Sequence, residues 1–203
     1  MTTIDNDGPP TLRQRRRERT RREIAAAALD VIADGGVELT TIDRVAETAG
    51  VARGTIYAHF PEGRDELLRA AYAELGSRVA DRTRAAADDA ETWSERIAAH
   101  AEPLFALAAD AHLGRFYHVS GPAIVHGRPE QGIGSGASAM LIRDALDTAR
   151  DAGAVPADTD SGLVAAMLIG ALREAAIGVA AGQLDQDRAR TAFARLVSGL
   201  AAS

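Results

Sequence analysis

Apolar residues recur at helical spacing through most of this 203-residue chain, and no segment alternates between apolar and polar positions as a strand does. The first clear pattern predicts a helix over 13–34 that ends at Gly35 and Gly36. Its apolar face consists of Ile24, Ala27, Ala28, Val31 and Ile32. The spacing of this face indicates that one side of the helix packs against the rest of the protein.

Two short helices are predicted next, with a glycine between them. Thr40 or Thr41 caps the first helix, and Gly50 supplies the turn before a second helix over 52–59. The buried face of the first short helix is predicted to be Ile42, Val45, Ala46 and Ala49. Two short helices joined by a tight turn, behind a longer first helix, form a helix-turn-helix.

The remaining sequence also predicts helices. Pro61 and Gly63 interrupt the chain before a helix over 64–85. Further helices are predicted over 91–110, 112–120, 136–151, 159–181 and 186–201, separated by glycine and proline. We therefore expect an all-α fold with three parts: a disordered arm over 1–10, a three-helix helix-turn-helix domain over 11–63, and a second helical domain over 64–203, to which the resemblance described below assigns regulation and dimerisation.

The charged residues are unevenly distributed along the chain, so the net charge alone does not predict whether it binds nucleic acid. The formal net charge of −6 argues by itself against binding to nucleic acid. However, residues 11–22 hold seven Arg and one acidic residue, whereas residues 71–203 hold 12 Arg and 17 acidic residues. Because phosphate binding depends on local charge, the basic segment favours contact with a nucleic acid. It is also consistent with the solvated face of a helix or with a disordered arm.

Composition excludes several classes of site. The chain has no cysteine, which excludes disulfides and thiolate metal sites and favours a reducing, cytoplasmic compartment. The longest apolar stretch, 163–181, is interrupted by Arg173 and Glu174, so we expect no membrane span. No arrangement of nucleophile and base indicates an enzyme, and no cofactor is expected.

The second short helix has the properties of a helix that enters the major groove. Such a helix is short and polar on its outer face, and it is small where the backbone approaches phosphate. Gly54 permits that close approach, and Arg53 is long enough to reach a phosphate or the edge of a guanine.

The segment TTIDRVAETAGVARGTIYAHF, residues 40–60, resembles the DNA-binding signature of the TetR-type transcriptional regulators. The resemblance extends over about 18–70. It implies that a set of residues contacts base edges or phosphates, namely Thr41, Arg44, Arg53, Gly54, Thr55, Tyr57, His59 and Arg64. Ala52 departs from the serine common at its position, which weakens the helix cap, and the link after Phe60 is one residue longer than the commonest form.

Each of these residues also has a purely structural interpretation. Tyr57 fits a core residue whose hydroxyl reaches water, and His59 fits a solvated surface histidine. For the whole chain, the alternative to a DNA-binding regulator is a helical protein-interaction module without sequence-specific DNA binding. The basic first helix and the polar second short helix argue against that alternative.

The resemblance implies a homodimer formed through the last two helices, about 159–181 and 186–201. The first of these is rich in Ala and Gly, and Leu163, Met167, Leu168, Ala171 and Ile177 are predicted to form its buried seam. The same residues also fit the core of a single chain. Dimerisation is favoured independently, because two motifs related by a two-fold axis read a palindromic site.

A small-molecule pocket is expected among the helices of about 64–151. The predicted lining combines apolar, aromatic and a few polar residues, namely Trp93, Ile97, His100, Phe105, Leu113, Phe116, Tyr117, Val119, Met140, Leu141 and Met167. Each of them equally fits plain core. Four histidines fall within 100–126, but their spacings of 12, 6 and 8 do not match a metal site. The glycines of 127–136 do not form a nucleotide-binding motif, because no strand precedes them.

Together these expectations describe a ligand-responsive, DNA-binding transcriptional regulator. We expect a repressor that a small molecule releases from double-stranded operator DNA. The sequence does not identify the ligand, the operator or the regulated genes.

Overall fold

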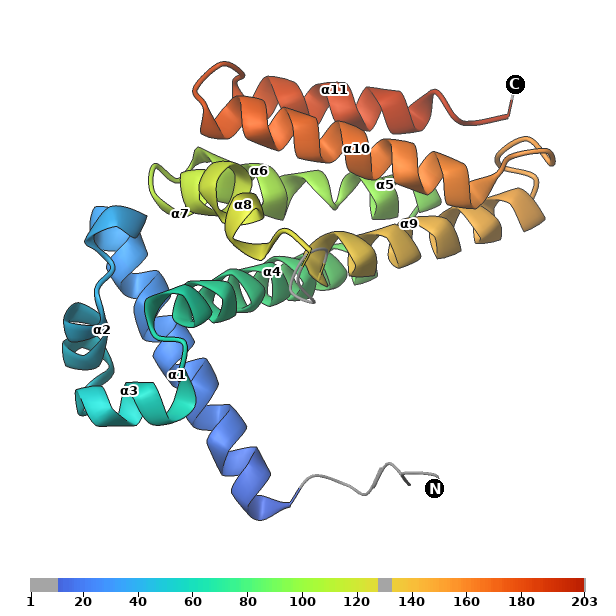
Figure 1. Ribbon diagram of the computed structural model, residues 1–203. Helices are drawn as coiled ribbons and strands as arrows, with labels where there is room; N and C mark the ends of the chain where they lie inside the picture. Colours follow the sequence, from blue (N-terminus) through green and yellow to red (C-terminus); the bar gives the residue numbers. More distant parts are fainter. Residues whose placement is uncertain (1–10, 128–132, 203) are drawn as a thin grey trace.

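The computed structural model describes residues 11–127 and 133–202, and these residues form helices and connecting turns without a strand (Figure 1). The predicted all-α fold is confirmed. The α-helices are α1 (Leu12–Gly35), α2 (Ile42–Ala49), α3 (Arg53–His59), α4 (Arg64–Asp88), α5 (Trp93–Ala98), α6 (Ala101–Ala109), α7 (Leu113–Arg115), α8 (Gly121–Val125), α9 (Ile133–Asp151), α10 (Ser161–Ala180) and α11 (Gln186–Ser198). The predicted arm over 1–10 lies outside the described residues.

The N-terminal helices α1, α2 and α3 pack around one apolar cluster together with the start of α4. The predicted face of α1 is buried there, with Ile24 and Ile32 fully inaccessible to solvent. Leu67 and Leu68 of α4 complete the cluster. A short 3-10 helix η1, Val37–Leu39, connects α1 to α2.

The helix α4 extends from the N-terminal cluster into the C-terminal helices, as Figure 1 shows. The C-terminal part has its own apolar cluster, formed mainly by α5, α6, α9, α10 and α11. In Figure 1, α10 and α11 lie side by side at the edge of the molecule farthest from α3. The helix α4 therefore connects the two parts, and Leu113 of α7 and Phe116 of η2 also contact the N-terminal cluster.

The observed helices differ from the predicted ones at two prolines, among other places. The helix predicted over 91–110 is divided into α5 and α6 around Ala99 and His100, because Pro103 has no N–H to donate to the carbonyl of Ala99 and its ring crowds that group. In contrast, the chain does not break at the predicted Gly121-Pro122 joint. A π-helical segment η2, Phe116–Ser120, leads directly from α7 into α8, and the Gly121 N–H donates to the carbonyl of Phe116.

Candidate DNA-binding surface and ligand cavity

The turn between α2 and α3 is fixed by local chemistry. The Thr41 hydroxyl accepts a hydrogen bond from the Arg44 N–H at 3.3 Å, which begins α2 at the predicted residue. Gly50 ends α2 with φ of 64°, a left-handed conformation that side chains with a Cβ rarely adopt. As predicted, Ala52 offers no side-chain cap to α3.

One side of α3 is buried and the other is open to solvent. Ile56 and the following Phe60 are fully buried and anchor the helix in the N-terminal cluster. The side chains of Arg53 and Tyr57 are exposed, with Tyr57 46% accessible. No heavy atom lies within 4 Å of a Cβ built at Gly54, so a second molecule has free access to the backbone there. Thr55 is half-buried beside this surface.

Acidic side chains accompany two of the predicted DNA-contacting arginines. The Arg53 guanidinium lies 2.9 Å from the Asp43 carboxylate, and that of Arg44 lies 3.9 Å from Asp34. All four side chains are substantially exposed, so these pairs are weak and readily exchanged.

Arg64 lies in a different environment from the other predicted DNA contacts. Its Nε donates to the Thr40 carbonyl at 2.7 Å and its Nη2 to the Val37 carbonyl at 2.6 Å. These bonds tie the start of α4 to η1 and place the guanidinium against its own chain. A contact between Arg64 and DNA stays a prediction.

The basic first helix supports α3 directly, which the sequence pattern did not reveal. Arg17 and Arg21 of α1 donate to the carbonyls of Ala58 and His59 at the C-terminal end of α3, where positive charge is favourable. Arg21 also lies 4.3 Å from the centre of the Phe60 ring and 3.1 Å from the Glu66 carboxylate. Arg17 and Arg21 therefore hold α3 in place in addition to contributing positive charge.

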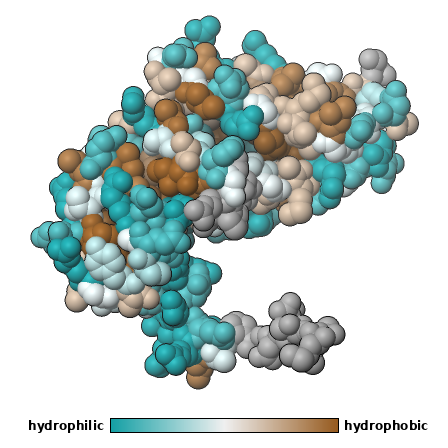
Figure 2. All heavy atoms as spheres, in the orientation of Figure 1, coloured by the Kyte–Doolittle hydropathy of each residue, from teal (hydrophilic) through white to brown (hydrophobic). Residues whose placement is uncertain are grey.

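The rest of that segment is available to a partner. Arg13, Arg15, Arg16, Arg19 and Arg22 are exposed on α1, and Figure 2 shows this end of the helix as a hydrophilic extension. His59 is half-buried, and burial together with the charges of Arg17 and Arg21 lowers the pKa of its imidazole. His59 therefore contributes a neutral ring to this surface near neutral pH.

A cavity of about 340 Å³ lies within the C-terminal part. Its walls come from α4, α6 and the preceding His100, η2, α8, α9 and α10. The lining residues are Tyr72, Gly76, Val79, Thr83, His100, Leu104, Tyr117, His118, Val119, Pro122, Ser135, Ser138, Ile169, Leu172, Arg173 and Ile177. Its existence and position agree with the predicted small-molecule pocket, and most of the lining differs from the prediction.

Of the predicted lining, His100, Tyr117 and Val119 border the cavity. Ile97, Phe105 and Phe116 are instead core residues, each at most 2% exposed, and Trp93 and Leu113 pack beside the core. Met140 and Met167 face solvent, 57% and 67% exposed, because they lie on the outer faces of α9 and α10. Leu141 is half-buried away from the cavity. No residue of α4 was named in the predicted lining, and Met167, the one residue predicted from α10, does not border the cavity.

Two histidines of the cavity are held neutral. His100 and His118 are 3% and 7% exposed, and burial lowers the pKa of each imidazole to about 4. The Nδ1 of His100 and the Nε2 of His118 are buried without a hydrogen-bond partner in the described part of the chain. Within residues 11–127 and 133–202, no group of three or more His, Asp or Glu side chains is placed to hold a metal ion.

These histidines predict a loss of stability in mild acid. Each has a folded pKa of about 4 and an ordinary value of 6.5, so between these values the unfolded chain binds more protons. Lowering the pH from 6 to 5 should then reduce the free energy of unfolding by about 1.4 kcal/mol per histidine. Urea unfolding followed by circular dichroism at both pH values tests this. The His100→Gln, His118→Gln double variant should lose most of the pH effect, and an unchanged effect would contradict the assignment.

A second apolar surface lies outside the core, where α10 and α11 meet. The groove between them is lined mainly by Ala171, Ala175, Leu184, Ala189, Phe193 and Leu196. Leu163 and Met167 extend it along α10 and are 59% and 67% exposed. Two residues of the predicted seam lie elsewhere, since Leu168 is buried in the chain's own core and Ile177 lines the cavity.

The helix α10 also meets the length and hydropathy of a membrane span, with a mean hydropathy of 1.8 over its apolar window. The core helix of a soluble protein passes the same test. Here one face of α10 packs in the C-terminal cluster and against α6 and α9, which accounts for part of its apolar character.

The geometry of the N-terminal domain agrees with comparisons to known proteins. A sequence profile described as bacterial regulatory proteins of the tetR family matches residues 24–71, which include α2, α3 and the start of α4. Over these residues the chain is similar to the TetR family. This confirms the resemblance predicted from residues 40–60.

Curated relatives match less than half of this chain. The HTH-type transcriptional regulator SrpR of Pseudomonas putida is 46% identical over 56 residues, covering 28% of this chain and 26% of that protein. The HTH-type transcriptional repressor LfrR of Mycolicibacterium smegmatis is 39% identical over 85 residues, covering 42% of this chain and 41% of that protein. The chain therefore aligns with less than half the length of these relatives.

Solved structures extend the likeness to nearly the whole fold. A TetR-family transcriptional regulator from Pectobacterium atrosepticum has a TM-score of 0.76 and covers 94% of this chain and 98% of its own, at 22% identity. At this level of identity the comparison shows a shared TetR-type fold, including the C-terminal helices, and carries no information on the ligand.

Proposed function

We propose that this TetR-type chain is a dimeric, cytoplasmic repressor that binds operator DNA through α2 and α3 and is released when a small molecule occupies the C-terminal cavity. The observation that carries the proposal is the exposed surface of α3. Arg53 and Tyr57 face solvent from a helix that Ile56 and Phe60 hold rigidly, which is the arrangement required of a helix that enters the major groove.

The contacts proposed for DNA combine positioning with base reading. Tyr57 and Thr41 hydroxyls, together with Arg44 and His59, would contact phosphates, and Arg53 would reach a base edge beside Gly54 and Thr55. The acids that accompany Arg53 and Arg44 in the free chain are exposed, so phosphates can replace them at small cost. The exposed arginines of α1 would add non-specific affinity that falls with salt.

Operator binding provides the direct test. Gel-shift titrations at one stated salt concentration, with DNA upstream of the encoding gene, should show specific binding. Arg53→Ala should weaken that binding about 10–100-fold by removing a base contact, and Tyr57→Phe about 3–10-fold by removing one hydrogen bond. Arg96→Ala, on exposed α5, serves as the control. Equal affinity of the unmodified chain for operator and for unrelated DNA would favour the helical interaction module instead. An Arg53→Ala variant that binds operator as tightly as the unmodified chain would contradict the role assigned to α3.

Coupling between cavity and DNA is supported by shared side chains. Tyr72 lines the cavity and packs against the N-terminal cluster, where its ring meets that of Phe116 edge-on at 6.1 Å. A ligand that displaces Tyr72 would therefore disturb the packing between α4 and α1. It can release DNA only to the extent that it binds the released conformation more tightly than the DNA-bound one.

Dimerisation is proposed through the exposed apolar face of α10 and α11. Replacing both Met167 and Leu196 with Glu would place charges inside that interface. The dissociation constant of the dimer should then rise about 100-fold or more, giving a monomer at micromolar concentration in size-exclusion chromatography with light scattering. Leu12→Glu, which changes an equally exposed leucine on α1, should leave the dimer intact. A dimer that survives the double substitution would place the interface elsewhere.

A further inference from the structure

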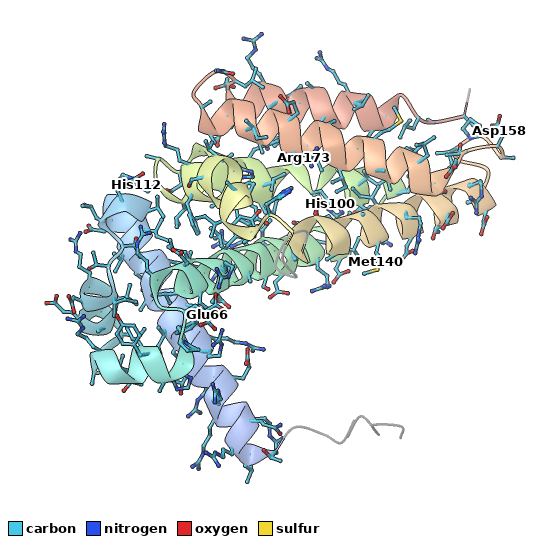
Figure 3. All side chains as sticks on the ribbon, in the orientation of Figure 1. Glu66, His100, His112, Met140, Asp158 and Arg173 are labelled. Atoms are coloured by element: carbon cyan, nitrogen blue, oxygen red, sulfur yellow. The ribbon has the colours of Figure 1, made fainter. Side chains whose placement is uncertain are left out.

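The charge of the cavity wall comes from one arginine. Arg173 is the single formally charged residue among the described lining, at the pH where His100 and His118 are neutral. It projects from α10 between Ile169 and Ile177, which lie one turn before and after it on the same wall. No acidic side chain of the described residues pairs with it. Figure 3 labels Arg173 on α10 and His100 near the centre of the C-terminal helices.

The remaining wall is mainly apolar and aromatic, with hydroxyl groups from Thr83, Ser135 and Ser138. Tyr72 and Tyr117 stack with their ring centres 4.8 Å apart, and His118 meets Tyr117 edge-on at 5.0 Å. Val79, Leu172 and the two isoleucines supply most of the other surface. Such a surface favours a flat, apolar ligand body over a hydrated one.

Two buried ring nitrogens indicate that the cavity is completed by a polar partner. The Nδ1 of His100 and the Nε2 of His118 lack hydrogen-bond partners within the described residues. Buried polar atoms without partners are rare in folded proteins, because each loses its hydration without replacement. Since both rings line the cavity, a bound molecule with hydrogen-bonding groups can reach them after a small rotation.

We propose that the cavity is selective for organic acids, binding an apolar, ring-containing monoanion whose carboxylate pairs with Arg173. The inference rests on the proposed function of the cavity as a ligand site and adds the class of ligand. Among the described residues, a cationic ligand would meet the positive charge of the exposed Arg173 and no carboxylate of the lining, which opposes its binding. A volume of about 340 Å³ lies near the lower end of the range for small-molecule sites, so the whole ligand is small.

Three naphthalene compounds that differ in the charge of the side chain test this selectivity: naphthylacetate, naphthylethanol and naphthylethylammonium. Isothermal titration calorimetry with the full chain at pH 7.5 measures each affinity. We expect naphthylacetate to bind about tenfold or more tightly than naphthylethanol, and naphthylethylammonium to bind most weakly. Arg173→Gln should weaken naphthylacetate about tenfold and leave naphthylethanol within about twofold.

Two further variants distinguish a wrong ligand class from a wrong location of the binding site. Arg82→Gln removes an arginine from the solvent face of α4, beside Thr83 of the cavity wall, and should change none of the affinities. Val79→Trp fills the cavity and should abolish binding of all three compounds. Equal binding of acid and alcohol, or an unaffected Arg173→Gln variant, would overturn the selectivity and leave the cavity as a ligand site. Binding that survives Val79→Trp, or no binding of any compound to the unmodified chain, would contradict the cavity as the site.

Discussion

Replacing Phe60 with alanine is expected to lower the free energy of unfolding by about 3–5 kcal/mol. The ring is fully buried in the N-terminal cluster, where it follows the last turn of α3. Its face also receives the Arg21 guanidinium at 4.3 Å from the ring centre, and that arginine in turn holds the carbonyl end of α3. The substitution therefore creates a cavity and removes the surface on which Arg21 rests.

The loss should reach operator binding as well as stability. Natural domains are stable by about 5–15 kcal/mol, so a loss of this size leaves a marginal N-terminal domain. Urea unfolding followed by circular dichroism measures the stability, and gel shifts below the unfolding midpoint measure binding. Phe60→Leu keeps most of the volume and should cost less than half as much. A loss below about 1 kcal/mol for Phe60→Ala would contradict the packing of α3 described above.

The helix-turn-helix was predictable because its determinants are local. Thr41 caps α2, Gly50 ends it, and the apolar spacing of Ile42, Val45 and Ala46 fixes the buried face. Each of these signals acts within four residues, so the sequence specifies the elements and their order. The role of Arg21 was not predictable, because its partners His59 and Glu66 lie 38 and 45 residues away.

The residues that line the cavity could not be predicted from the spacing of apolar residues alone. The helix α10 is apolar on both sides, and the spacing of Leu163, Leu168 and Ile177 does not tell which side meets which neighbour. In the structure these residues face the outer surface, the core and the cavity, respectively. Aromatic residues did not identify the lining of the cavity for the same reason. Phe105 and Phe116 lie in the core, whereas Tyr117 lines the cavity.

Gly121 lies beside the cavity, next to the lining residue Pro122, and is expected to tolerate no larger residue. A Cβ at this position would lie 2.5 Å from the Phe116 carbonyl oxygen and 2.5 Å from Cδ2 of Tyr72. The carbonyl accepts the Gly121 N–H that ends η2, so it cannot move away without breaking that bond. Gly121→Val should therefore cost about 3 kcal/mol of stability, at the upper end of the range for overpacked cores.

The same substitution should disturb the cavity, because the displaced group is Tyr72, which stacks on Tyr117 in its wall. Thermal unfolding of Gly121→Val measures the first effect, and calorimetric titration with naphthylacetate below the unfolding temperature measures the second. Gly136→Ala is the matched control, since no heavy atom lies within 4 Å of its Cβ position and the glycine is exposed in α9. That variant should gain about 0.5–1 kcal/mol, because alanine is the better helix former. A Gly121→Val protein as stable as the unmodified chain would show that η2 and Tyr72 pack less tightly than these contacts require. That result would also contradict the proposed link between the cavity and the N-terminal cluster.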